Sequence, residues 1–225
     1  MKNNKEEFRT CSMEAEMVEI GRRMYARGFV AANDGNCSCR LQHDLFLMTP
    51  TGVSKGFMTP EMLIKTDKNG AVATGKGTPS SEMPMHMEIY RQRTDVQAIV
   101  HAHPPVATAF SAAGISLEEP VFPEAVVNLG PVPVVPYATP GTIEAADVVG
   151  DYCQKGNALL LANHGAVTWG RTLMEAWFRM ETLEHTAYMF SLLRRMGLSP
   201  GKLNKEEVSK LLKIHGSDHQ RRTGE

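Results

Sequence analysis

Two short apolar runs that lead into histidines constrain this chain more than any other feature of its sequence. VQAIV (residues 96–100) runs directly into His101 and His103, and LLLAN (residues 159–163) runs into His164. Apolar runs of this length, bounded by Pro or Gly, are typical of buried strands. Residues i and i+2 of a strand point to the same face. His101 and His103 should therefore project together, as a shared metal ion requires.

Helical and strand-like segments alternate along the rest of the chain. Apolar residues recur at helical spacing in residues 6–27 and 172–197, and Gly28 suits the end of the first helix. We predict an α/β fold, a three-layer α/β/α domain with a central, mostly antiparallel sheet. Its length suits a single domain over residues 1–225, with a polar tail from about residue 202 that holds one weakly amphipathic segment.

Composition excludes several classes of protein. The formal net charge is −1 with both signs spread along the chain, so no basic surface for nucleic acid is expected. No apolar run approaches the roughly 20 residues of a membrane helix, and the first ten residues lack the apolar core of a signal peptide. The four cysteines form no paired framework, which favours the reducing cytoplasm. Cys37 and Cys39 are either soft metal ligands or, as we favour, small residues on one face of a strand.

The three histidines have two interpretations. Three nitrogen ligands with one open position describe a catalytic divalent site, usually zinc. An isolated HxH pair is more often a surface pair or a satisfied core pair. The placement of His101, His103 and His164 at two separate strand ends, each bordered by Pro or Gly, favours the metal site without deciding the matter.

Glu82 lies in PSSE at a predicted helix start, where Ser80 or Ser81 would serve as the N-cap. Its structural interpretation is simple, because an acid in a first helical turn is stabilised by the helix dipole. Beside a metal ion, the same carboxylate would either bind the metal or transfer protons.

Three clusters of small polar residues lie at junctions between predicted elements: NDGNCS, TPTG and PSS. Glycine allows close approach of the backbone, and Asn, Ser and Thr supply neutral donors for an anion. Each cluster taken alone is more simply a turn. None matches a nucleotide-binding fingerprint, so no nucleotide is inferred.

Several of these motifs occur in an order that resembles the class II aldolase/adducin family. The specific parts are PSSE, HAHP and NHG, and GFVAANDGNCSCR and MTPTG support them. The resemblance covers roughly residues 10 to 200 and is closest to enzymes of the L-fuculose-1-phosphate aldolase type. It implies a cytoplasmic lyase of carbohydrate metabolism, commonly a homotetramer with active sites at subunit borders.

The resemblance also assigns roles to residues. It implies that His101, His103 and His164 bind one divalent metal per subunit, most simply Zn²⁺, with Mn²⁺, Co²⁺ or Fe²⁺ as alternatives. It makes Glu82 the acid/base carboxylate, which also reaches the metal. The substrate phosphate would be held by Asn33, Gly35, Asn36, Thr51, Gly52, Ser80 and Ser81. Asn33 stands where many relatives carry Thr or Ser, and Phe122 lies where a tyrosine donor for the aldehyde is expected.

The implied reaction is reversible retro-aldol cleavage of a ketose 1-phosphate to dihydroxyacetone phosphate and a small aldehyde. A sugar-phosphate 4-epimerase, a decarboxylase of 3-oxo-acid phosphates and a methylthioribulose-phosphate dehydratase are alternatives on the same fold. Epimerases of the family typically carry Asp in place of Glu82, so PSSE favours the aldolase. An adducin-like binding module is the alternative without catalysis, and it would be expected to lack the histidines.

Overall fold

The computed structural model describes residues 4–222, and the side chains of residues 13–215. In this part of the chain, eight strands form one sheet in the order β4-β3-β2-β1-β5-β8-β7-β6. Neighbouring strands are antiparallel except for the parallel β6–β7 pair, so the predicted mostly antiparallel sheet is confirmed. The strands are β1 (Asn36–Arg40), β2 (Leu45–Met48), β3 (Ile64–Asp67), β4 (Val72–Thr74), β5 (Ala98–Ala102), β6 (Val134–Val135), β7 (Ala158–Leu161) and β8 (Gly165–Gly170).

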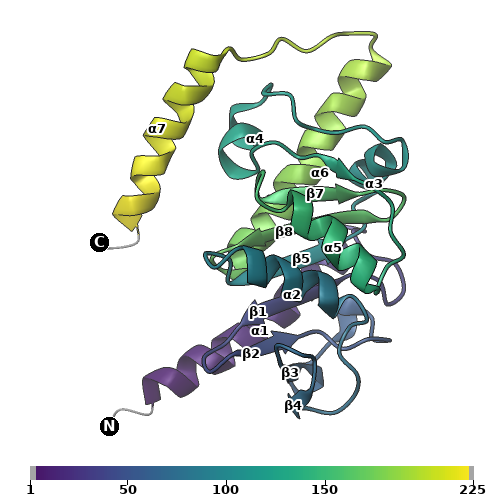
Figure 1. The fold of residues 1–225 in the computed structure, drawn as a ribbon, viewed down its shortest axis with the longest axis vertical. Coiled ribbons are helices and arrows are strands. Elements are labelled where there is room, and N and C mark those ends of the chain that lie inside the picture. The colour runs from purple at the N-terminus through teal and green to yellow at the C-terminus, as the bar shows by residue number, and fades with distance from the viewer. Residues whose placement is uncertain (1–3, 223–225) are drawn as a thin grey trace.

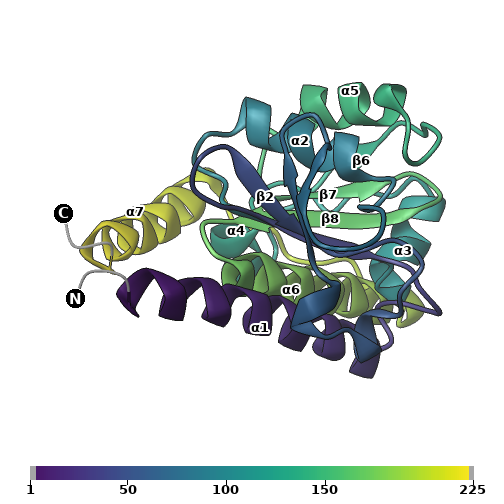
Figure 2. The same cartoon turned by 90° about the horizontal axis from the view of Figure 1, so that it is seen from below.

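Helices cover both faces of this sheet and make the predicted three layers (Figure 2). The layer on one face consists of α2 (Met83–Gln92) and α5 (Ile143–Tyr152). The other face is covered by α1 (Asn4–Ala26), α3 (Pro105–Ala112), α4 (Pro123–Asn128) and α6 (Leu173–Arg195). Two short 3-10 helices, η1 (Lys55–Phe57) and η2 (Pro60–Met62), connect β2 to β3.

The strands distribute their side chains between two apolar cores, one on each face of the sheet. In β5, Ala98 and Val100 pack in the core that includes α1 and α6, whereas Ile99 packs in the core beside α2 and α5. This alternation follows from the two-residue period of a strand. Cys37 and Cys39 are buried on one face of β1, as the favoured interpretation predicted.

The C-terminal segment differs from the sequence prediction of a polar tail with one short amphipathic segment. The structure has an 18-residue helix there, α7 (Lys205–Arg222), which stands apart from the sheet and approaches α4 (Figure 1). The linker before it is held by an ion pair between Lys202 and Glu119 and by a hydrogen bond from Leu203 N–H to the Pro120 carbonyl. Among the described residues, no helix combines the length and apolar character needed to cross a membrane.

Candidate active site

The three predicted histidines meet at one end of the central strands. His101 lies in β5, His103 lies just past that strand, and His164 lies in the turn between β7 and β8. Their ring centroids are 4.7 to 5.1 Å apart. Since β5 ends at Ala102, strand periodicity alone does not pair His101 with His103. The two imidazoles nevertheless converge, with their Nε2 atoms 3.3 Å apart.

Glu82 completes the cluster from the helical layer. Its Oε2 atom is 3.1 Å from Nε2 of His101, and its Oε1 atom is 3.4 Å from Nε2 of His164. The prediction of Ser80 or Ser81 as N-cap was wrong, because Glu82 itself occupies the cap position of α2. The Ser80 carbonyl accepts the N–H of Met83 in a turn, which delays the start of the helix and brings Glu82 to its N-terminus.

The electrostatics of the cluster centre on His101 and Glu82. Burial favours the neutral form of both, yet the Glu82 carboxylate raises the pKa of His101 above its usual value. Burial by itself would raise the pKa of Glu82. The charge of His101 and the hydrogen bonds from His101 and Asn36 outweigh it, so the pKa of Glu82 is lowered. Burial and the neighbouring His101 lower the pKa of His103, and bring that of His164 down to about 4. Of the three histidines, His101 is therefore the one whose protonated form the surroundings favour.

Backbone contacts fix the orientation of the imidazoles. Nδ1 of the fully buried His101 donates to the Ala166 carbonyl at 2.9 Å, which leaves Nε2 facing the cluster. Gly165 is required at the next turn, because a Cβ atom there would lie 2.5 Å from Cδ2 of His103 and 2.6 Å from the Ala102 carbonyl oxygen. The NHG motif therefore combines His164 with a backbone that passes close to HAHP.

The donor set fits a divalent metal ion. Nitrogen atoms of His101, His103 and His164 all lie within 4.8 Å of one another. Three imidazoles with an adjacent carboxylate are the ligand types of catalytic zinc and related transition-metal sites. A metal ion would take the place of the proton that His101 holds, since metal ligands must be deprotonated.

The loops predicted to bind phosphate are tied to one another, and two of them make hydrogen bonds with Glu82. The Thr51 N–H donates to the Thr78 carbonyl at 3.0 Å, which joins the TPTG loop to the PSS loop. Asn36 donates its side-chain Nδ2–H to Glu82 Oε2 at 2.8 Å, so in this structure its amide contacts the carboxylate. The predicted residues divide into exposed Asn33, Thr51, Gly52 and Ser81, partly buried Ser80, and buried Gly35 and Asn36. Their contact with phosphate stays a prediction.

A ladder of polar contacts that the sequence analysis missed positions α2 over β1. Every second residue of β1 contacts every fourth residue of α2 or its cap: Asn36 with Glu82, Ser38 with His86 and Tyr90, and Arg40 with Tyr90. Polar residues recur at every second position of β1 and at every fourth position from Glu82 along α2. This matched spacing is the sequence signal that could have indicated the pairing.

A second feature that the sequence did not indicate is a small cavity of about 20 Å³ beside Glu82 and His164. Its far wall includes Pro140, Gly141 and Thr142, from the loop before α5. This loop, for which no site residue was predicted, therefore lines the same cavity as two residues of the cluster.

Comparisons with known proteins agree with this geometry. The family model of the class II aldolase and adducin N-terminal domain matches residues 15–191. An L-fuculose phosphate aldolase of Methanococcus maripaludis is 36% identical over 181 residues, which cover 80% of this chain and 97% of that protein. A 3-oxo-tetronate 4-phosphate decarboxylase of Haemophilus influenzae is 37% identical over 183 residues, which cover 79% of this chain and 86% of that protein.

The fold has a solved counterpart as well. The structure of an L-fuculose 1-phosphate aldolase is similar with a TM-score of 0.84 and 29% identity, over 91% of this chain and 96% of that one. The residues matched by the family model include all eight strands and all four residues of the cluster. This chain belongs to the class II aldolase and adducin N-terminal domain family, and it is an enzyme of the aldolase type.

Proposed function

We propose that this enzyme cleaves a ketose 1-phosphate of the fuculose or 5-deoxypentulose type into dihydroxyacetone phosphate and a small aldehyde. The observation that carries the proposal is the convergence of His101, His103, His164 and Glu82 beside loops of small polar residues. The similarity to an L-fuculose phosphate aldolase supports the same reaction. The three histidines would hold one divalent ion per subunit, for which we propose Zn²⁺.

A divalent ion held by the three histidines would supply Lewis acidity, which would stabilise negative charge on the ketose oxygens as the C3–C4 bond breaks. Glu82 moves the proton at C3. In the cleavage direction it returns a proton to C3, and in the synthetic direction it removes one from C3 of dihydroxyacetone phosphate. The amide of Asn36 holds one carboxylate oxygen at 2.8 Å and so limits the rotation of this group.

The phosphate would bind across three loops, with contacts from Asn33, Gly35, Asn36, Thr51, Gly52, Ser80 and Ser81. Exposure of Thr51, Gly52 and Ser81 makes their donors accessible to a ligand. We also propose a cytoplasmic homotetramer, by analogy with the aldolases that the sequence resembles.

A decarboxylase of 3-oxo-acid phosphates is the second candidate. The observation that favours it is the 37% identity to a 3-oxo-tetronate 4-phosphate decarboxylase. Both reactions leave a negative charge next to a carbonyl group and then need a proton at that carbon. The residues of the cluster would serve either reaction equally, so only the substrate distinguishes the two candidates.

The test is a direct comparison of substrates. Zinc-loaded protein would be incubated with fuculose 1-phosphate, 5-deoxyribulose 1-phosphate, ribulose 5-phosphate and 3-oxo-tetronate 4-phosphate, with and without a chelator. Chelator-sensitive release of dihydroxyacetone phosphate from a 1-phosphate is the expected result. Release of carbon dioxide from the 3-oxo acid alone would overturn the aldolase in favour of the decarboxylase, and conversion of ribulose 5-phosphate without cleavage would favour the epimerase.

A further inference from the structure

Lys55 is a buried lysine that lies between two of the proposed phosphate loops. The residue opens η1, and only 1% of its surface is exposed. Its ammonium group donates to the Val53 carbonyl at 2.6 Å and to the Asn33 carbonyl at 3.0 Å. One side chain therefore joins the loop that contains Asn33 to the loop that contains Thr51 and Gly52.

The charge of this ammonium has no close compensation in the described part of the chain. The carboxylate whose charge reaches it, Asp34, lies 3.6 Å from Nδ1 of His103 and makes no ion pair with Lys55. The nearby Cys37 thiol does not supply a negative charge, because burial raises its pKa to about 12. Burial also lowers the pKa of Lys55. A buried cation without an anionic partner is costly, so its retention calls for an explanation.

The position of Lys55 suggests what supplies the missing negative charge. One acceptor carbonyl belongs to Asn33, which is itself a proposed phosphate-binding residue, and the other belongs to Val53, directly after Gly52. A phosphate bound by these loops would lie near the ammonium and bring up to two negative charges. In a partly buried site, such charges act over several ångströms with little screening.

We propose that Lys55 is a positioning residue of the phosphate site, which holds the Asn33 and Val53 carbonyls together and whose charge is compensated by the phosphate of the substrate. This inference rests on the proposed function, because it needs a phosphate bound by the three loops of small polar residues, which we call the phosphate cradle. It adds a residue outside the predicted set. Lys55 acts through the two loops and through its charge, without direct contact to the reacting carbons.

The test is binding of inorganic phosphate to the zinc-loaded full chain by isothermal titration calorimetry. Lys55→Met keeps the length of the side chain and removes its charge, and should weaken phosphate binding roughly ten- to a hundredfold. Zinc stoichiometry and the circular dichroism spectrum should not change. The matched control is Lys65→Met, because Lys65 is a partly exposed lysine paired with Glu14 at 2.9 Å. Its phosphate affinity should stay within about twofold of the wild-type value.

Further variants separate charge from packing. Lys55→Arg keeps the charge and should recover most of the phosphate affinity, and Lys55→Gln replaces Lys55→Met if the latter does not fold. Equal phosphate affinity of the wild type and the folded uncharged variant, with only a lower melting temperature, would overturn the inference and leave the cradle intact. Absence of phosphate binding to the wild type would overturn both the cradle and the role of Lys55. Aldol cleavage, measured separately, tests the reaction itself.

Discussion

Glu82 and His101 face each other across the site, with Oε2 of the carboxylate 3.1 Å from Nε2 of the imidazole. Each comes from a different layer, since Glu82 caps α2 and His101 lies in the central strand β5. Each also favours the charged form of the other. The pair therefore favours a proton on a nitrogen that a metal ion would bind.

Zinc affinity should therefore depend on pH through His101. Its pKa is raised in the folded protein, so the proton is retained to a higher pH than on a free imidazole and must leave when zinc binds. Affinity should fall as the pH drops below this raised pKa, by up to about tenfold per pH unit. Glu82→Gln removes the cause of the shift, and the decline should begin at a lower pH. The measurement is zinc competition against a chelator between pH 5.5 and 8.5, and coincident midpoints for both proteins would contradict the prediction.

Removal of a single histidine should remove bound zinc. His103→Ala or His164→Ala leaves two imidazoles, and their partly exposed positions allow the substitution without loss of the core. Metal content after gel filtration should fall far below the wild-type stoichiometry. The control is His185→Ala, which changes an exposed histidine of α6 and should retain full zinc. A His103 or His164 variant that kept stoichiometric metal would remove that residue from the ligand set.

The central strands and their histidines were predictable because their signals are local. An apolar run followed by HAH or NHG indicates a strand with histidines at its end, and strand periodicity sends neighbours to opposite faces. The signal for the end of α1 was equally local, since Gly28 takes a φ of +67° two residues after Ala26, the last residue of the helix. The three-layer fold follows from the order of such segments together with the recognised motifs.

The remaining features depend on contacts between distant segments. Lys55 occurs in a polar loop sequence that predicts a surface residue, yet it is buried in η1, against which α1 packs. The bond between Ser38 and His86 joins residues 48 positions apart. The full length of α7 was not predicted because its sequence is polar and has little apolar periodicity.

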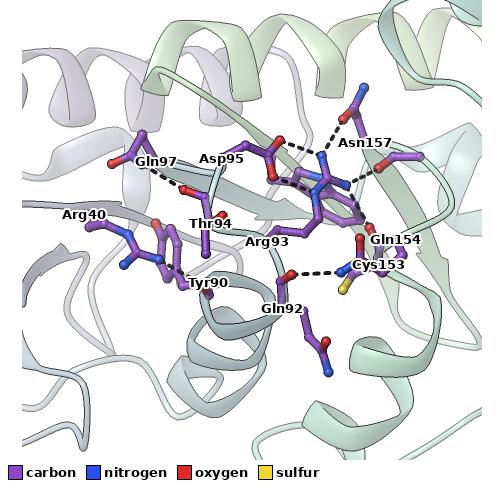
Figure 3. Close-up of polar contacts among 12 residues, drawn as sticks. Arg40, Tyr90, Gln92, Arg93, Thr94, Asp95, Gln97, Cys153, Gln154 and Asn157 are labelled. Carbon is purple, nitrogen blue, oxygen red and sulfur yellow. Dashed lines mark hydrogen bonds and ion pairs between the residues drawn. The ribbon is translucent and has the colours of Figure 1, made fainter.

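Arg93 should be a structural clamp at the far end of α2 (Figure 3). Its guanidinium makes two bonds to Asp95, each 2.8 Å, and donates to the carbonyls of Cys153 and Gly156 at 3.0 Å. Lysine cannot reproduce this fork, so Arg93→Lys should lower the free energy of unfolding by about 1–3 kcal/mol. Urea denaturation would measure it, with Arg91→Lys as the control.

The control is informative because Arg91 is 69% exposed and pairs with Glu88 on the surface of the same helix. Its replacement by lysine should change the free energy of unfolding by less than about 0.5 kcal/mol. Equal losses for both variants would mean that the bonds of Arg93 to the two carbonyls contribute nothing measurable.

The buried bonds of Ser38 should be energetically coupled. Its Oγ atom lies 2.7 Å from Nδ1 of His86 and 2.9 Å from the hydroxyl of Tyr90, and all three residues are buried. Ser38→Ala leaves two buried polar groups without a partner and should lower the free energy of unfolding by about 1–3 kcal/mol. Tyr90→Phe removes one of these groups, so it should cost less in the Ser38→Ala background than in the wild type. A double-mutant cycle in urea should show a coupling of at least about 0.5 kcal/mol, whereas additive losses would mean that Ser38 and Tyr90 act independently.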